Sequence, residues 1–414
     1  MTVANTMSTT QCCIAGGGPA GLMLAYLLAR AGVRVTVLEK HADFLRDFRG
    51  DTVHPSTLEV MAELGLIDRF LALPHQKVSK VGGYVGKTPV TIADLSHLPV
   101  RERYIAMMPQ WDFLNFLERE AAHYPGFTLH MRTEATGLLE EGGRVVGITA
   151  ESPEGAAEIR ADLTVAADGR NSILRQRAGL VVDDLGAPID VLWFRVPAAP
   201  GDAGETMGRF GAGSILVLIF RGDYWQCAYV IPKGAFAGIK AAGLVAFRDA
   251  IADASPFARA RLDAIASWDD VSLLTVRVDR LRQWCRPGFL CIGDAAHAMS
   301  PIGGVGVNLA IQDAVASANI LAEALKAGRV SLDNLRAVQT RRMFPTRVTQ
   351  AIQVAMQNSI IGPTLTLTEE PKPPFALRLL QWFPLLQRLP ARILGLGVRR
   401  EHVAEFVRGG GVKR

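Results

Sequence analysis

The chain has 414 residues, of which 49% are hydrophobic and 21% charged, and its formal net charge is +5. This composition provides for a large buried core and argues against global disorder. The charge is small for this length, and Lys and Arg alternate with Asp and Glu, so the sequence argues against nucleic-acid binding while permitting anionic small molecules as ligands.

The N-terminus and the cysteines favour a cytoplasmic protein. The first ten residues are polar and lack an apolar signal core. No uninterrupted apolar stretch reaches the ~20 residues of a membrane-spanning helix, so we expect no transmembrane segment. The five cysteines show no metal-ligand spacing, and we expect no metal site and buried thiols in a reducing compartment. They are Cys12, Cys13, Cys227, Cys285 and Cys291.

Residues 11–39 are predicted to form a βαβ unit. Residues 12–15 make a short apolar strand, and a glycine-rich turn follows over residues 16–21. Residues 22–31 are rich in helix formers and end at Gly32, as helices commonly do. Residues 33–38 form a second buried strand, so a parallel pair crossed by a helix is the expected topology.

The turn of this unit has the spacing of a dinucleotide-binding loop. Gly16 permits the tight turn, Gly18 lets the backbone approach a pyrophosphate, and Gly21 lets the helix lie close on the sheet. Pro19 and Ala20 lie in the same turn, and the N-terminus of the helix that follows supplies free N–H groups and a partial positive charge that favour a pyrophosphate. A glycine turn without a ligand is the alternative.

An acid follows at the end of the second strand. Glu39 lies 18 residues after Gly21 and is placed to accept hydrogen bonds from a ribose diol. A carboxylate there repels a 2′-phosphate, so the pocket suits FAD or NAD rather than NADP. Lys40, the next residue, is assigned to the same pocket.

Later elements are predicted more coarsely. Helices are expected over residues 57–65 and 111–123, and strands over residues 129–139, 144–150 and 163–167. The stretches 78–90 and 182–274 have the short apolar runs that are typical of antiparallel strands. We therefore expect a discontinuous FAD-binding domain, an inserted β-sheet substrate domain and a helical tail. Their predicted ranges are 8–77, 97–181 and 275–360 for the first, 78–96 and 182–274 for the second, and 361–414 for the third.

A second glycine loop favours FAD over NAD. The apolar strand 289–292 leads to Gly293 and Asp294, and Asp294 is placed to accept from a ribityl hydroxyl. A loop containing Pro301, Gly304 and Gly306 then lets a flavin edge come close to the backbone. Val307 and Asn308 begin a long alanine-rich helix to Lys326, whose positive end would stabilise a reduced flavin anion at N1–C2=O.

Together these motifs resemble a known family. Residues 293–314, GDAAHAMSPIGGVGVNLAIQDA, resemble the second FAD signature of the flavoprotein monooxygenases typified by p-hydroxybenzoate hydroxylase. Residues 166–172, with Asp168, resemble the family's Asp-Gly motif, which lies near FAD and the path of the pyridine nucleotide. Arg49, within Phe48–Asp51, and Gln110 fall where the family contacts the flavin. The resemblance covers roughly residues 10–330.

The resemblance implies an α/β fold in which a Rossmann-like FAD-binding domain is interleaved with an antiparallel β-sheet substrate domain, followed by C-terminal helices. It implies a single-component monooxygenase in which transiently bound NAD(P)H reduces FAD. Reduced FAD reacts with O2 to a C4a-hydroperoxide, which hydroxylates a phenol, enol or quinol. The alternatives are a non-hydroxylating FAD oxidase or reductase, and a flavin-binding regulatory protein without turnover.

Several features argue against other flavoproteins. No second GxGxxG in a βαβ unit exists for NADPH, which disfavours a disulfide reductase, and Cys12 and Cys13 are adjacent rather than spaced as CxxC. Halogenation is disfavoured because a WxWxIP-type motif is missing. The flavin performs the chemistry, so catalytic residues are left unassigned. His54, His297 and Tyr224 are candidates for proton relay or substrate contact, and a structural role is the alternative for each.

The substrate domain is rich in aromatic residues, which indicates an apolar, polycyclic or prenylated aromatic substrate, although core packing would explain the same residues. These are Trp193, Phe194, Phe210, Phe220, Tyr224 and Trp225. The apolar and basic stretch 371–406 is expected to pack as helices on the main body, with peripheral membrane contact or a dimer face as alternatives. A monomer or a homodimer fits the sequence, which does not distinguish NADH from NADPH.

Overall fold

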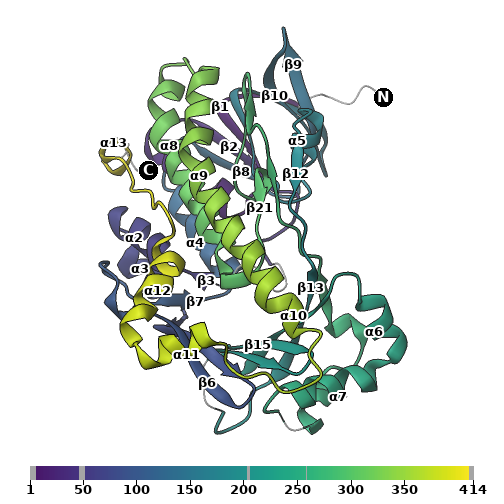
Figure 1. Cartoon of the computed structure of the whole chain (residues 1–414). Helices are drawn as coiled ribbons and strands as arrows, with labels where there is room; N and C mark the ends of the chain where they lie inside the picture. Colours follow the sequence, from purple (N-terminus) through teal and green to yellow (C-terminus); the bar gives the residue numbers. More distant parts are fainter. Residues whose placement is uncertain (1–5, 46–51, 203–205, 258, 410–414) are drawn as a thin grey trace.

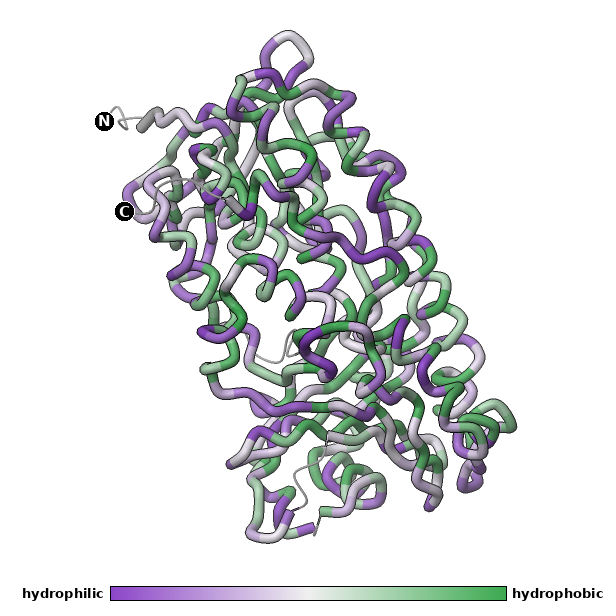
Figure 2. The backbone as a smooth tube through the Cα atoms, turned by 90° about the vertical axis from the view of Figure 1, so that its left-hand side faces the viewer, coloured by the Kyte–Doolittle hydropathy of each residue, from purple (hydrophilic) through white to green (hydrophobic). Residues whose placement is uncertain are grey.

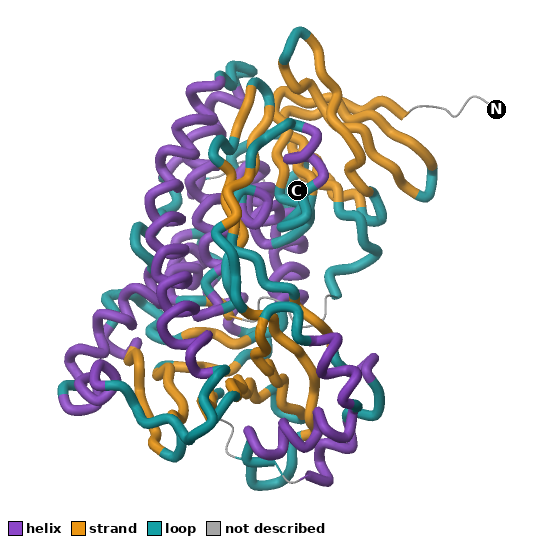
Figure 3. The backbone as a smooth tube through the Cα atoms, turned by 45° about the vertical axis from the view of Figure 1, so that its right-hand side comes forward, coloured by secondary structure: helices purple, strands orange, loops and turns teal. Residues whose placement is uncertain are grey.

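The computed structural model describes residues 6–45, 52–202, 206–257 and 259–409. Figure 1 shows an elongated molecule with a sheet at each end, and the helices α8 and α9 run side by side along its length. In Figure 3 the helices of the upper half gather on one side and the strands on the other. Hydrophobic stretches run through both halves in Figure 2, as expected for two packed layers.

The upper sheet has eight strands in the order β19-β20-β11-β1-β2-β8, and β10 and β9 continue from β11. The strands β20, β11, β1, β2 and β8 are parallel, whereas β9, β10 and β19 pair antiparallel. Their bounds are β1 Thr6–Ala15, β2 Val35–Leu38, β8 Phe127–His130, β9 Glu134–Glu141, β10 Arg144–Ser152, β11 Gly155–Ala166, β19 Cys285–Arg286 and β20 Phe289–Cys291.

Helix α1 is at the centre of the upper half because it is apolar on every side. Residues 20–29 are all buried, and α1 packs between α8 and α4 on the parallel strands. A helix that is apolar all round belongs in a core. The helices of this half are α1 Pro19–Arg30, α2 Pro55–Glu63, α3 Ile67–Leu71, α4 Gln110–Ala121, α5 Ile173–Arg177, α8 Gly306–Lys326 and α9 Leu332–Met356.

The lower sheet has seven strands in the order β17-β13-β16-β15-β14-β5-β6, so it joins the chain around residues 80–94 to the chain around 189–274. Helices α6 and α7 cover one of its faces. The bounds are β5 Lys80–Val85, β6 Thr88–Asp94, β13 Ile189–Pro197, β14 Met207–Gly211, β15 Ser214–Phe220, β16 Tyr224–Pro232, β17 Ser272–Leu274, α6 Phe236–Ala242 and α7 Leu244–Ala254.

Two small sheets connect the halves. One has the order β3-β7-β4 and the other β12-β18-β21. Their bounds are β3 Thr52–Val53, β4 Gln76–Val78, β7 Ile105–Met107, β12 Val182–Asp184, β18 Asp279–Leu281 and β21 His297–Ala298. The chain ends in short helices, which are α10 Gly362–Thr364, α11 Phe375–Trp382, α12 Arg388–Leu396 and α13 Glu405–Arg408.

Several predicted elements are corrected. The strand expected over residues 129–139 is two strands, β8 and β9, because the chain turns at Arg132, which has a φ of 53°. The stretch 182–274 contains α6 and α7 as well as strands. Within the described ranges, one helical stretch, Ile302–Lys326, is long and apolar enough to span a membrane, but 78% of its apolar stretch is buried inside the protein.

Candidate functional site

Three motif loops leave the parallel sheet at one edge. Ala15 of β1 is paired with Ala166 of β11, and Ala166 is paired with Cys291 of β20. The carboxyl ends of these parallel strands therefore lie side by side, and the chain continues from them into the loops at residues 16–18, 167–170 and 292–296. The strand order reverses between β1 and β11, which is where open α/β sheets bind their ligands.

The three glycines of the first loop have different surroundings. Gly16 has a φ of +105°, and a Cβ there would lie 2.3 Å from the carbonyl oxygen of Ala167. A Cβ on Gly21 would lie 2.0 Å from the carbonyl oxygen of Gly16, so both positions need glycine for packing. A Cβ on Gly18 would have nothing within 4 Å. Open space at Gly18 is what close approach of a ligand to the backbone requires.

Helix α1 begins directly behind this space. Its N-terminus has no side-chain cap and no acid in the first turn, and Pro19 occupies its first turn. Ala20 contacts the third loop, since a Cβ on Gly293 would lie 3.0 Å from that of Ala20. The free N–H groups of α1 are thus available to an anion.

Glu39 is held against the glycine turn. Its two carboxylate oxygens accept hydrogen bonds from the N–H of Gly17 at 2.9 Å and of His41 at 3.0 Å. The side chain is buried, so the carboxylate has a fixed orientation beside the turn. Lys40, by contrast, is exposed and forms an ion pair with Glu134 at 3.8 Å.

The second and third loops contact each other through an ion pair. Asp168 accepts hydrogen bonds from the N–H groups of Ile173 at 3.0 Å and Leu174 at 3.4 Å, and burial raises the pKa of its carboxyl group. The guanidinium group of Arg170 lies 3.5 Å from the carboxylate of Asp294. The Asp-Gly loop is therefore connected to the loop after β20.

The glycine loop before α8 packs against β3. Thr52 donates to the carbonyl oxygen of Gly304 at 2.8 Å, and a Cβ on Gly304 would lie 2.4 Å from the Thr52 hydroxyl. The loop begins with Pro301 and leads to Gly306, the first residue of α8. Among the described residues, no side chain caps the N-terminus of α8, and its first turn, which includes Val307, contains no acid.

Asn308 connects α8 to α2. Its Oδ1 accepts hydrogen bonds from the N–H of His54 at 3.1 Å and the hydroxyl of Thr57 at 2.7 Å. Its Nδ2 is buried and has no partner in the described part of the chain. Gln110 is the first residue of α4 and lies three residues after Met107, the strand partner of Thr52. Arg49 lies outside the described residues.

A row of three glutamines, two near the end of α9 and one directly after it, holds the loop between β21 and α8, and the sequence did not predict this role. Gln350 donates to the carbonyl oxygens of Asp279 and Ala298. Gln353 donates to the carbonyls of Ser300 and Ile302 at 2.9 and 3.0 Å and accepts from the N–H of Ser300 at 3.1 Å. Gln357 donates to the hydroxyl of Ser300 at 2.8 Å. Their spacing of three and four residues on one helix face was the available signal.

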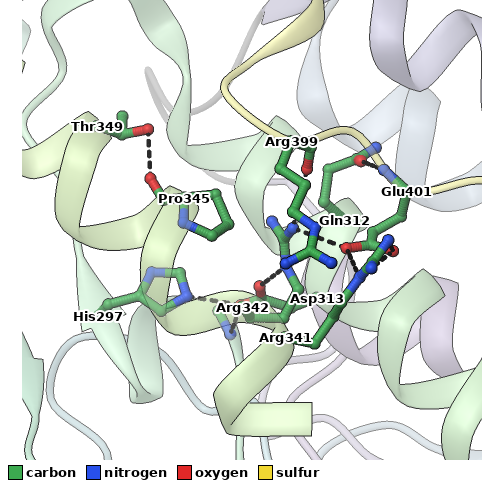
Figure 4. Close-up of polar contacts among 10 residues, drawn as sticks. His297, Gln312, Asp313, Arg341, Arg342, Pro345, Thr349, Arg399 and Glu401 are labelled. Carbon is green, nitrogen blue, oxygen red and sulfur yellow. Dashed lines mark hydrogen bonds and ion pairs between the residues drawn. The ribbon is translucent and has the colours of Figure 1, made fainter.

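Asp313 of α8 is the centre of a buried polar network (Figure 4). Its carboxylate accepts from the N–H of Gly293 at 3.1 Å, from His297 at 2.6 Å and from Arg342 at 2.9 Å. Arg342 also donates to Glu401 at 3.2 Å, which joins the C-terminal segment to the loop after β20. Burial opposes ionisation of Asp313, but His297 and Arg342 lower its pKa below the usual value. His297 therefore positions this loop.

His54 is also buried. Its Nδ1 lies 2.7 Å from the carbonyl oxygen of Leu394 in α12. Burial lowers the pKa of His54 to about 4, although the carbonyls of Leu394 and Gly303 oppose the shift. Tyr224 lies at the start of β16, under the guanidinium group of Arg195 at 5.0 Å.

The aromatic residues of the lower sheet divide between its two faces. Phe194, Phe220 and Trp225 pack on the face covered by α6 and α7, where they form core. Trp193 and Phe210 pack on the opposite face, in a cluster with Ile302 of the glycine loop. The remaining residues of that cluster are Ile189, Val191, Ile215, Val217, Ala228, Val230, Val276, Ile361, Leu365, Leu274 and Ala187.

These features fit FAD. The open space at Gly18 and the uncapped α1 suit a pyrophosphate, the fixed carboxylate of Glu39 suits a ribose diol, and the uncapped α8 suits the negative end of a flavin. In the described ranges, no group of three or more His, Cys, Asp or Glu side chains could hold a metal ion.

Comparisons with known proteins agree with this geometry. Residues 9–352 match the family described as FAD binding domain. Over 389 residues the chain is 34% identical to 6-methylpretetramide 4-monooxygenase of Streptomyces rimosus, covering 92% of this chain and 90% of that protein. It is 30% identical to rifampicin monooxygenase of Streptomyces venezuelae over 73% of this chain and 61% of that protein.

The fold is shared with solved structures. The structure of p-nitrophenol 4-monooxygenase from Pseudomonas putida superimposes with a TM-score of 0.74 and 18% identity, covering 95% of this chain and 100% of that one. With the FAD binding domain matched over most of the chain, the fold and the sequence relatives lead to one conclusion. The chain belongs to the FAD-dependent aromatic monooxygenases with the p-hydroxybenzoate hydroxylase fold.

Proposed function

We propose that this monooxygenase hydroxylates an apolar, polycyclic phenol or quinol, using NAD(P)H and O2. The observation that carries the proposal is the apolar face of the lower sheet, where Trp193 and Phe210 pack with Ile302 of the glycine loop. An aromatic substrate on this face would lie beside the loop assigned to the flavin. Similarity to an enzyme of aromatic polyketide hydroxylation, 6-methylpretetramide 4-monooxygenase, supports the same substrate class.

The residues that would hold FAD are those of the three loops. Gly18 and the helix start at Pro19 and Ala20 would bind the pyrophosphate, and Gly16 and Gly21 would shape the turn that holds it. Glu39 would bind the ribose, with Lys40 beside it. Bound FAD supplies hydride acceptance and oxygen activation, which no side chain of the protein can provide.

The remaining predicted contacts would surround the ribityl chain and the flavin ring. Asp294, next to Gly293, would accept a hydrogen bond from a ribityl hydroxyl, and Asp168 would lie near the same loop. The positive end of α8, at Gly306, Val307 and Asn308, would stabilise negative charge on the reduced ring. Pro301, Gly304, Gln110 and Arg49 complete the proposed set.

The protein's own tasks are positioning and exclusion of water. The glutamines of α9 and the Asp313 network fix the loop from Gly293 to Ile302 through buried hydrogen bonds, so the proposed flavin site is rigid. The apolar sheet face would orient the ring at short distance from the reacting atoms and keep water away. Burial lowers the pKa of His54 to about 4, so its side chain is neutral near pH 7 and adds no positive charge beside Asn308.

We also propose the predicted division of the chain. The FAD-binding part comprises residues 8–77, 97–181 and 275–360, the substrate part comprises 78–96 and 182–274, and a helical tail follows from residue 361.

A reducing cytoplasm suits the cysteines, because all five are free and buried, and burial raises the pKa of Cys13 to about 12.

Substrate-stimulated NAD(P)H oxidation tests the substrate class. We expect polycyclic phenols to stimulate oxidation and to be hydroxylated, and p-hydroxybenzoate to do neither. Trp193→Phe should raise KM for the polycyclic phenol several-fold, while Trp268→Phe, on the face covered by α6 and α7, should leave KM unchanged. Equal KM values for the two variants, or a preference for p-hydroxybenzoate, would contradict the proposed substrate face.

A further inference from the structure

The C-terminal helices expose an unusual amount of apolar surface. Of the 17 exposed large hydrophobic side chains found in the described part of the chain, seven lie within residues 375–393. Apolar residues scattered singly on a surface need no explanation, but a cluster of this kind marks an interaction site. The seven are Phe375, Trp382, Phe383, Leu385, Leu386, Leu389 and Ile393, and we call their surface the α11–α12 face.

The inner side of this segment is already fixed to the protein. Gln381 of α11 accepts from the N–H of Thr91 at 3.1 Å and donates to its carbonyl at 2.8 Å, which pairs α11 with the edge strand β6. In α12 the buried residues are the small Ala391 and Gly395 together with Leu396. A Cβ on Gly395 would lie 2.6 Å from the side chain of Leu98, so α12 cannot rotate its outer residues inward.

Seven large apolar side chains of this segment nevertheless remain exposed, although Leu396 is buried. On α12 the exposed Leu389 and Ile393 lie four residues apart on one side, with Arg388 and Arg392 beside them. On α11 the exposed Phe375 and Trp382 contact each other with ring centroids 6.3 Å apart. A segment that exposes this many large apolar side chains together has a further surface to cover.

The charge of the same segment indicates what covers it. Residues 371–400 contain six basic residues, namely Lys372, Arg378, Arg388, Arg392, Arg399 and Arg400, and no acidic residue. The guanidinium group of Arg378 lies over the Trp382 ring at 5.0 Å, next to the apolar side chains. Two acids flank this stretch: Glu370 pairs with Lys87 at 3.9 Å, and Glu401 pairs with Arg341 and Arg342 of α9.

We propose that the α11–α12 face binds the surface of a membrane that contains anionic lipids. The apolar side chains would enter the boundary between headgroups and acyl chains, and the arginines would bind the lipid phosphates. Exposed Trp and Phe between cations suit this boundary, where amphipathic rings gather. A second copy of the chain docked by a two-fold axis would bring the arginines of the two faces together, and their like charges disfavour self-association through this face.

Docking there would bring the flavin loop close to the lipid. On the inner side of α12, Leu394 contacts Gly303 of the glycine loop, where a Cβ would lie 3.1 Å from the leucine side chain. The carbonyl of the same Leu394 bonds to His54. One helix therefore separates the α11–α12 face from the loop assigned to FAD.

Co-sedimentation with vesicles tests the proposal on the full-length, FAD-loaded protein and needs no substrate. We expect binding to vesicles of equal phosphatidylcholine and phosphatidylglycerol, at least about tenfold tighter than to phosphatidylcholine alone, and weakened by added salt. Leu385→Ser with Leu389→Ser, and separately Arg388→Gln with Arg392→Gln, should each lower binding by about tenfold or more.

All four substituted side chains are exposed, so these variants should fold like the wild type. The matched control is Val245→Ser, at a 70% exposed site on α7, which should bind vesicles like the wild type. Sedimentation equilibrium of the same proteins without lipid gives their oligomeric state. Absence of binding to anionic vesicles would overturn the proposal, as would unchanged binding by both double variants. A dimer that the leucine variants dissociate, without vesicle binding, would show instead that the face joins two copies.

Discussion

Replacing Gly18 with Ala tests the proposed pyrophosphate site without disturbing the fold. Gly18 has a φ of −78° and a ψ of −175°, which other residues adopt readily. A Cβ there meets no atom of the described residues within 4 Å. The free energy of unfolding of the apoprotein should therefore stay the same or rise by up to about 1 kcal/mol.

The effect on FAD should be large. The methyl group would occupy the space through which the phosphates approach the N–H groups of the first turn of α1. Loss of two hydrogen bonds to a charged phosphate, at about 1.5 kcal/mol each, gives about 3 kcal/mol. That free energy corresponds to about a 100-fold increase in Kd for FAD.

Two further glycines provide the comparison. A Cβ on Gly21 would lie 2.0 Å from a backbone carbonyl, so Gly21→Ala should destabilise the apoprotein by about 1–3 kcal/mol. Gly238 of α6 is exposed and open like Gly18, and Gly238→Ala should leave FAD binding unchanged. Urea unfolding and fluorescence titration with FAD measure both quantities. A folded Gly18→Ala protein that binds FAD like the wild type would refute the assignment of this loop.

Three other predictions concern the groups that hold the loop. Asp313→Asn leaves buried Arg342 and His297 without their carboxylate and should lower the free energy of unfolding by about 3 kcal/mol or more in urea; an unchanged midpoint would contradict the network. Gln353→Leu removes three hydrogen bonds to Ser300 and Ile302 and should alter the visible circular dichroism of bound FAD, whereas an identical spectrum would mean that the loop keeps its shape without them. The folded-state pKa of His54 is about 4, below its usual 6.5, so unfolding takes up a proton between these values. Stability from His54 is complete above pH ~6.5 and falls by about 3 kcal/mol as the pH drops toward 4. His54→Gln should lose that dependence in urea titrations across this pH range, and an equally steep dependence in the variant would assign it to other groups.

The loops of the site could be predicted because short sequence patterns determine them. One βαβ unit explains several features of the sequence together, and the structure contains that unit. These features are the strand at 12–15, the glycines at 16, 18 and 21, and the acid at 39. The helix expected from Asn308 to Lys326 is present and begins two residues earlier, at Gly306. Such turns and helix starts depend on the conformations of neighbouring residues, so a short stretch of sequence is enough to predict them.

The supporting contacts could not be predicted because they join distant segments. Gln353 bonds to Ser300 across 53 residues, and Glu401 reaches Arg342 across 59. Because side chains alternate along β13, Trp193 and Phe194 are expected on opposite faces of the sheet. Which face packs against the glycine loop depends on how the sheet docks on the rest of the protein, and the sequence does not show that. Pro390 is a residue type that ends most helices, yet it lies in the first turn of α12, where proline is tolerated.

The measurement that tests the central claim most directly is the mass of the product formed under 18O2. The FAD-loaded protein is supplied with NAD(P)H and a polycyclic phenol, and the product is analysed by mass spectrometry. An FAD-dependent aromatic monooxygenase predicts one labelled oxygen atom in the ring product, with the other in water. A product oxidised without label, or a colourless protein that FAD cannot reconstitute, would contradict the account.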